Sequence, residues 1–131
     1  MPIYLNIIFV TLLSLEGAGV QPIKLRKVSN VGEYGLRTLI QKRVRPSYPV
    51  SSQRAGKEGV AVANVKVNES GSVERVNILQ APDKEINKSV DVALRQWRFN
   101  VPKGFELLEG VVIIYFRKTT AGWLVSYPEE F

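Results

Sequence analysis

The chain has 131 residues, of which 45% are hydrophobic, and a formal net charge of +6 at pH 7. This length suits one domain with an N-terminal extension, and the apolar fraction is sufficient for a packed core, which argues against global disorder. Cysteine and histidine are both absent, which excludes disulfides and removes the commonest general base and metal ligand, so we expect no enzyme, cofactor or metal site.

The N-terminal end is dominated by an apolar run from Ile3 to Leu15. The run is about 13 residues long, shorter than the ~20 residues that span a bilayer as a helix. Small residues at 17–19 follow it, as at the cleavage site of a signal peptide, although no lysine or arginine precedes the run. We expect residues 1–20 to be a signal peptide or a short membrane anchor. A start codon set inside a longer membrane segment is the remaining alternative.

Residues 21–45 carry most of the excess positive charge. They hold seven lysines and arginines against one glutamate, whereas the rest of the chain is nearly neutral. Such a segment is a solvated linker, or it binds nucleic acid, anionic lipid or an acidic partner. We expect no nucleic acid as a partner, because only Tyr34 and Tyr48 stand near the cations to stack on bases. Apolar residues between Val31 and Val44 predict a weak amphipathic helix.

The middle of the chain predicts a β-hairpin. A short helix over residues 50–55 comes first. Residues 59–68 then alternate apolar and polar side chains, which is typical of a half-buried strand. Glu69-Ser70-Gly71 forms the turn, with glycine where a positive φ is needed. A second strand runs from Val73 to Gln80, and a change in its apolar spacing near the start indicates a bulge.

A helix from Ile86 to Trp97 follows, with Asp83 able to cap its first free N–H groups. Its apolar side chains recur at the spacing of one buried stripe, at Ile86, Val90, Ala93, Leu94 and Trp97. Pro102 closes the extended stretch that ends the helix, and we assign Trp97 and Phe99 to the core. A helix with one apolar stripe needs a sheet to cover, and strands lie on both sides of it in the sequence.

The last strong strand runs from Gly110 to Arg117 and contains an unbroken apolar run, Val111–Phe116. A run without alternation indicates that both faces are covered, either by residues 123–127 as a short fourth strand or by a partner. We predict an α+β fold, a small antiparallel sheet of three to four strands with one main helix packed across it. The domain would span residues 46–127, followed by a tail at 128–131.

Several motifs occur together and in a fixed order. They are Pro46-x-Tyr48-Pro49, Gly59 followed by apolar residues at 61, 63, 65 and 67, Gly71-x-Val73 with Val76 and Ile78, Trp97-Arg98-Phe99-x-x-Pro102, and Gly110-Val111-Val112-Ile113-Ile114-Tyr115-Phe116. This combination resembles the C-terminal domain of TonB, the periplasmic protein that drives outer-membrane receptors, over residues 45–118. The resemblance implies the fold predicted above and a binding module instead of an enzyme.

In TonB-like proteins, a receptor offers a short extended segment to one edge of the sheet, and main-chain hydrogen bonds give the affinity. The resemblance therefore implies TonB-dependent outer-membrane receptors as partners, a periplasmic location and a role in energised transport. An apolar strand near the chain end is also a natural unpaired edge. The expected partner-binding residues are Tyr48, Pro49, Val111, Val112, Ile113, Ile114, Tyr115, Phe116 and Arg117. Those at 112, 114 and 116 are either contacts or plain core.

The chain departs from full-length TonB at its N-terminal end. Full-length members carry a membrane helix with a histidine motif, docked on inner-membrane motor proteins, and a long proline-rich spacer. Here histidine is absent, and about 25 residues at up to ~3.5 Å each cannot cross the periplasm. Motor proteins are thus a second implied partner with less support, and residues 3–15 are the tether to the inner membrane if they are retained. The alternative function is an envelope interaction domain or homodimer that uses the same fold without transducing energy.

Overall fold

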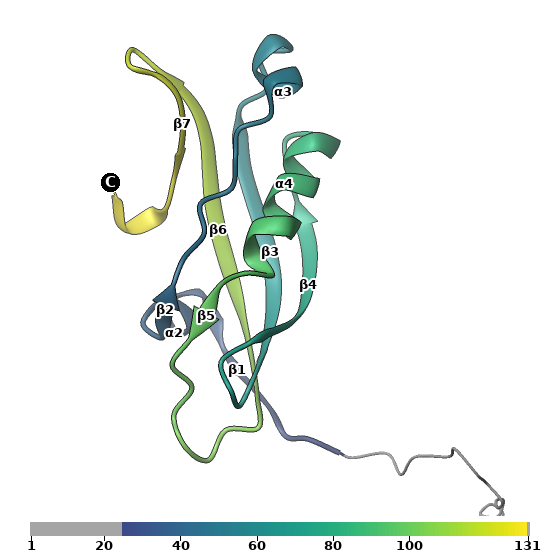
Figure 1. Ribbon diagram of the computed structural model, residues 1–131, viewed down its shortest axis with the longest axis vertical. Coiled ribbons are helices and arrows are strands. Elements are labelled where there is room, and N and C mark those ends of the chain that lie inside the picture. The colour runs from purple at the N-terminus through teal and green to yellow at the C-terminus, as the bar shows by residue number, and fades with distance from the viewer. Residues whose placement is uncertain (1–24, 131) are drawn as a thin grey trace, which may run out of the picture.

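The structure is a computed structural model that describes residues 25–130 (Figure 1). In chain order its elements are β1 (Val28–Val31), α2 (Gly32–Arg37), β2 (Ile40–Lys42), α3 (Val50–Arg54), β3 (Gly59–Asn68), β4 (Val73–Gln80), α4 (Lys84–Leu94), β5 (Arg98–Phe99), β6 (Leu107–Thr119), β7 (Gly122–Ser126) and the 3₁₀ turn η1 (Pro128–Glu130). The expectations for residues 1–20 lie outside the described residues. Between residues 25 and 130, no helix has the length and apolar character that crossing a membrane requires.

Five strands form one sheet in the order β1-β6-β3-β4, with β7 also paired to β6. β1 runs parallel to β6, and the other pairs are antiparallel. A second, two-stranded sheet joins β2 and β5. The predicted α+β class is confirmed. The short fourth strand predicted over residues 123–127 is present as β7. The sheet is mixed and one strand larger than the predicted antiparallel sheet of three to four strands, because the N-terminal segment supplies the parallel strand β1.

The β3–β4 hairpin forms where the alternating pattern predicts it. The register of the pair shifts between Lys66 and Val67, which places the predicted bulge near the start of β4. Gly71 in the turn has φ of +90°, and a Cβ atom there would lie 2.0 Å from the carbonyl oxygen of Phe99. Only glycine fits this position, because a side chain would meet both the backbone strain and the Phe99 carbonyl.

Helix α4 packs its apolar stripe on the sheet and buries Ile86, Val90 and Leu94 completely. Its cap is the predicted one, since the Asp83 carboxylate accepts a hydrogen bond of 2.8 Å from the backbone N–H of Ile86. The helix ends at Leu94, before the predicted end at residue 97. Trp97 is nevertheless fully buried, so its assignment to the core is confirmed.

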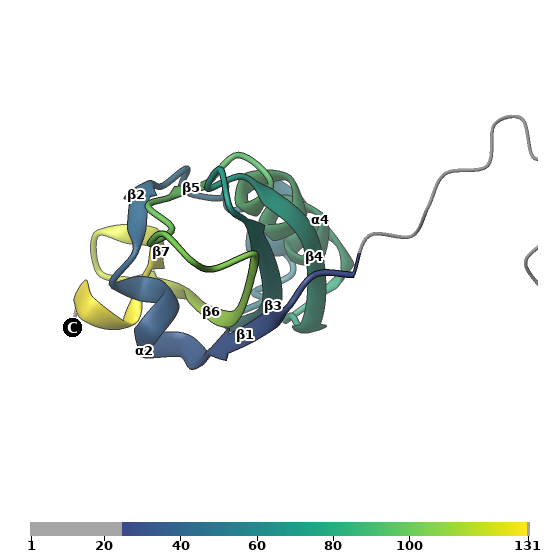
Figure 2. The same ribbon diagram turned by 90° about the horizontal axis from the view of Figure 1, so that it is seen from below.

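The segment before residue 46 differs from the predicted linker with one weak helix. Only Gly32–Arg37 is helical. Of the apolar residues on either side, Val31 belongs to β1 and Ile40 to β2, whereas Leu39 and Val44 lie outside the strands. Leu36 is 1% exposed because α2 lies directly on β6, where Gly110 leaves room for it. Figure 2 shows α2, β2 and the C-terminal end grouped around β6, on the side away from α4. The basic segment is thus packed on the domain core.

Candidate functional site

Strand β6 is paired along almost its whole length. On one side it meets β3 from Leu107 to Phe116. On the other side it meets β1 at residues 107–109, with a further bridge from Gly32 to Gly110, and it meets β7 at residues 115–119. The expectation of an unpaired edge over 110–117 is therefore wrong for both ends of that range. In the part of the chain that the structure describes, only Val111–Ile114 has no strand on this side, and we call this stretch the β6 window.

The two faces of β6 are covered unequally. Val112, Ile114 and Phe116 are buried against the core, so the open question about these three residues is answered in favour of core. The alternate side chains, including Val111 and Ile113, are half-buried on the opposite face of the sheet. Partner contacts from the window would therefore come from its backbone and from this second face, since the first is already packed.

Tyr48 and Pro49 lie at the end of β6 that pairs with β7. The Tyr48 ring packs edge-on against Phe116, with centroids 5.2 Å apart, and against Trp123 at 5.0 Å. Burial raises the pKa of Tyr48, and its hydroxyl donates a hydrogen bond to the Lys57 carbonyl. Pro49 precedes the first residue of α3. Tyr48 thus contacts one member of the group with which it was predicted, Phe116, whereas neither Tyr48 nor Pro49 lines the pocket along the β6 window.

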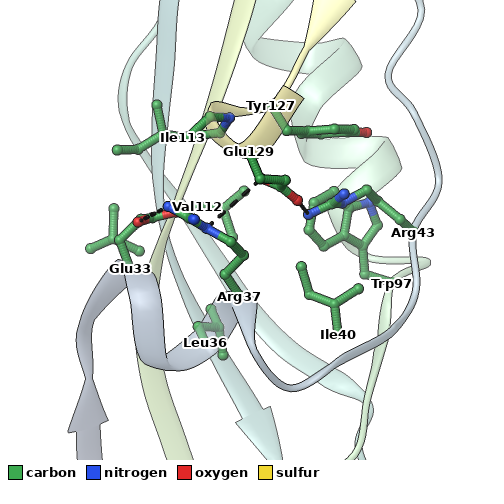
Figure 3. Close-up of a pocket in the computed structure, with 12 residues that line it drawn as sticks. Glu33, Leu36, Arg37, Ile40, Arg43, Trp97, Val112, Ile113, Tyr127 and Glu129 are labelled. Carbon is green, nitrogen blue, oxygen red and sulfur yellow. Dashed lines mark hydrogen bonds and ion pairs between the residues drawn. The ribbon is translucent and has the colours of Figure 1, made fainter. Parts of the chain in front are cut away.

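A narrow pocket runs along the β6 window, between α2 on one side and the C-terminal tail on the other (Figure 3). The residues that line it are Glu33, Leu36, Arg37, Ile40, Arg43, Trp97, Val111, Val112, Ile113, Tyr127, Pro128 and Glu129. Its enclosed volume is only about 10 Å³, roughly the space of one water molecule. The pocket is a seam between packed segments and too small for a ligand while the tail is docked.

Tyr127 anchors the tail in this seam. Its side chain is 1% exposed and packs edge-on against Trp97, with ring centroids 5.8 Å apart. Two guanidinium groups lie over the ring, that of Arg43 at 4.0 Å and that of Arg45 at 4.7 Å. Cations in such positions are attracted to the face of an aromatic ring. Residues 40–45, which we call the β2 segment, thus hold the tail through both charge and packing.

The two glutamates of η1 complete the attachment. Glu129 pairs with Arg43 and lies 3.8 Å from Arg37, which also binds Glu33 at 2.7 Å, so the ion pairs cross from α2 through the tail to residue 43 (Figure 3). Glu130 pairs with Arg45 at 2.9 Å. The side chains of this arrangement are partly exposed, so each pair adds little stability by itself. Together they fix where the tail lies.

The charges of this arrangement shift the acidity of both glutamates. The hydrogen bond from Arg45 and one from the backbone N–H of Tyr127 lower the pKa of Glu130. Burial alone would raise the pKa of Glu129, but a backbone hydrogen bond and Arg43 lower it overall. Both side chains are therefore ionised at neutral pH. Sequence reasoning treated residues 128–131 as a free tail and missed this role, for which the only signal was the pair of adjacent acids against the basic segment.

The other edge of the sheet, β4, has a different character. Its register against β3 shifts twice, and Glu74 and Arg75 stand exposed on it. Glu74 is also bound by the Arg26 guanidinium at 2.7 Å. Bulges and charges of this kind prevent an edge from pairing with other chains. The β6 window carries only apolar side chains, so it is better suited than β4 to accept a strand.

The remaining chemistry of residues 25–130 is sparse. In this range no three histidine, cysteine, aspartate or glutamate side chains gather where they could hold a metal ion. The charged side chains described above serve caps and ion pairs between segments. The site is therefore an arrangement of backbone edge, apolar face and charged tail, suited to binding another chain.

Comparisons with known proteins show the family and the fold. Residues 44–118 match the family described as Gram-negative bacterial TonB protein C-terminal. The solution NMR structure of the Pseudomonas aeruginosa TonB C-terminal domain is similar to this chain, with a TM-score of 0.51 and 20% identity, over 60% of this chain and 83% of that one. A search of curated proteins found no match. The similarity to the solved structure shows a shared fold.

Proposed function

The chain belongs to the family of TonB protein C-terminal domains, and on this premise we propose that it is a binding module of the periplasm that engages TonB-dependent outer-membrane receptors. An extended receptor segment would pair with β6 by strand addition and so support energised transport across the outer membrane. The observation that carries the proposal is the β6 window, a stretch of sheet edge with apolar side chains between two paired ends.

The geometry limits what can bind without rearrangement. Four residues of strand span about 13 Å at ~3.3 Å per residue. A segment of that length matches the gap between β1 and β7, and its side chains would meet Val111 and Ile113 on the half-buried face of the sheet. It can enter only when the tail moves aside, because the seam along the window has a volume of about 10 Å³. A longer segment must take the place of β7 along Tyr115 to Thr119.

Site-specific cross-linking in cells tests the proposal. The chain has no cysteine, so single cysteines at Val111, Ile113, Tyr115 and Arg117 can be paired with cysteines in the periplasmic segments of the receptors. The matched controls are cysteines at Asn77 and Leu79, which are exposed on the opposite edge strand β4.

We expect disulfides to receptors from the β6 positions and none from the β4 positions, because strand addition brings only one edge close to the receptor. Cross-links that join two copies of this chain, with none to receptors, would reject the receptor proposal. They would favour instead the homodimer or the envelope interaction domain that does not transduce energy.

A further inference from the structure

We propose that the groove in which the tail lies, between the β2 segment, α2 and β6, is the docking site for an extended partner segment with an aromatic anchor followed by acidic residues. The chain's own tail, residues 122–130, occupies this groove as an internal competitor. The inference deepens the proposed function, on which it rests for the receptor as the source of the segment.

The chemistry of the groove specifies its occupant. The ring of Tyr127 packs edge-on against Trp97, and the Arg43 guanidinium group lies over both rings, 4.0 Å from the centroid of Tyr127 and 5.3 Å from that of Trp97. Next to these rings, Arg37 and Arg45 point their guanidinium groups at the two carboxylates of η1. Three guanidinium groups around one apolar slot favour a segment with an aromatic side chain and neighbouring negative charge.

The tail fits this groove imperfectly. Among the described residues, three buried side-chain polar atoms find no hydrogen-bond partner, namely Nε of Arg43, Oγ of Ser126 and the hydroxyl of Tyr127. All three lie in the tail or directly against it. Unsatisfied buried polar groups oppose the packing that buries them and mark a contact of reduced stability. Release of the tail would let water satisfy the Ser126 and Tyr127 hydroxyls, and a partner that accepts a hydrogen bond from Arg43 Nε would satisfy the third atom, so such a partner would compete well with the tail.

The groove is continuous with the β6 window. Val112 lines the pocket together with Tyr127, and the strand that leads into the tail, β7, pairs with β6 from Tyr115 onward. A segment that displaces the tail therefore gains the aromatic slot and the backbone edge in one event. An occupied groove lowers the apparent affinity by the fraction of molecules in which it is open, so a tail that is open in about a tenth of molecules weakens partner binding about tenfold.

A labelled peptide with the sequence of residues 122–131 is the probe, added to the full-length chain and followed by fluorescence anisotropy. The competing tail is weakened by the double substitution Glu129→Gln and Glu130→Gln in the chain. Because this change also makes the protein more basic, the matched control is Glu69→Gln with Glu85→Gln, which alters the same charge at exposed positions outside the groove.

We expect the probe to bind the tail variant about tenfold more tightly than it binds the wild-type chain or the control variant. A second probe, in which glutamine replaces both glutamates, should lose about tenfold in affinity for the tail variant, because it cannot pair with the three arginines. Equal binding of the first probe to all three proteins, or of both probes to the tail variant, would overturn the proposal.

If the tail variant does not fold, a second measurement on the wild-type chain still tests the proposal. In the wild-type chain, the Trp97 indole N–H donates a hydrogen bond of 2.8 Å to the Val44 carbonyl, beside the slot. Its NMR resonance should shift as the first probe is added and stay unchanged with the second. No shift with the first probe at millimolar concentration would reject the groove as a docking site.

The outcomes separate this inference from the proposed function. Probe binding to the groove without receptor cross-links to β6 would uphold the docking site and reject the receptor as its partner. A different result would uphold the proposed function and reject the competing tail. In that case the probe does not bind, and receptors cross-link to β6 equally strongly in the wild-type chain and the tail variant.

Discussion

The close contact between α2 and β6 predicts that Gly110→Ala destabilises the protein. A Cβ atom at residue 110 would lie 2.6 Å from the carbonyl oxygen of Gly32 and 2.8 Å from the Cβ of Leu36. Ordinary contacts begin at 3.4 Å, so α2 would have to move out by about 0.8 Å to restore normal packing. The Gly32 oxygen belongs to the backbone and cannot rotate away, so the whole short helix must shift.

The size of the effect follows from two opposing contributions. Overpacking of a methyl group costs about 1–3 kcal/mol. Replacing a strand glycine also recovers about 0.5–1 kcal/mol, because alanine has less backbone freedom to lose on folding. The 2.6 Å contact with a backbone atom places the overpacking cost at the upper end of its range. We therefore expect a net loss of roughly 2–2.5 kcal/mol in the free energy of unfolding, which lowers the urea midpoint by about 1 M for a protein of this size.

Equilibrium unfolding in urea, followed by tryptophan fluorescence, measures this loss. The companion variant is Leu36→Ala, which alone should cost about 2–5 kcal/mol because it empties a buried site. In the Gly110→Ala background the same substitution should cost less, since the shortened side chain relieves part of the crowding, with a coupling of about 0.5–3 kcal/mol. If the Gly110→Ala protein has the same free energy of unfolding as the parent, the close packing of α2 against β6 at Gly110 is refuted.

Three further outcomes follow from named contacts. Asp83→Ala should remove about 1 kcal/mol of stability at pH 7, because α4 loses its cap. Burial alone would raise the pKa of Asp83, but hydrogen bonds lower it, so this loss should shrink as pH falls through the lowered pKa. A loss in urea unfolding that does not change with pH would contradict this. Trp97→Phe should cost about 1–3 kcal/mol in the same assay, because the partly buried carbonyl of Val44 loses its donor. An unchanged midpoint would contradict this bond. Acid should loosen the tail, since the pKa values of Glu129 and Glu130 are both lowered in the folded chain. Their contribution to stability is complete at neutral pH and is lost as pH falls through the lowered pKa values. Hydrogen exchange of the tail amides should therefore accelerate at this pH, before that of the α4 amides, and simultaneous acceleration would contradict a separate tail.

The hairpin and the main helix could be predicted from the sequence because local patterns determine them. The alternation over Gly59–Asn68 reflects a strand with one buried face, and Asp83 identifies the start of α4 by the chemistry of its side chain. The end of the helix was less certain, because Trp97 is buried whether or not its backbone is helical.

The N-terminal segment could not be predicted in the same way. Its strands β1 and β2 are four and three residues long, too short to show a period, and they pair with β6 and β5 from far along the chain. The identity of β6 as the binding strand stays a prediction. What the sequence could not show is that β1 and β7 occupy most of the edge of β6, since this depends on contacts between distant residues, such as Arg43 with Glu129, 86 residues apart.

The convergence of β1, α2 and the C-terminal segment on β6 has a consequence for aggregation. The run Val111–Phe116 has no charge, proline or glycine, the composition of segments that stack into intermolecular β-structure. The β3–β4 and β6–β7 hairpins need only tight turns, whereas β1 pairs with β6 across about 80 residues of chain, which costs more chain entropy and takes place later. During folding, the side of β6 that β1 and α2 cover is therefore exposed longest. These two segments thus protect the protein from pairing with its own copies, and a variant that lacks them should refold well only at low concentration.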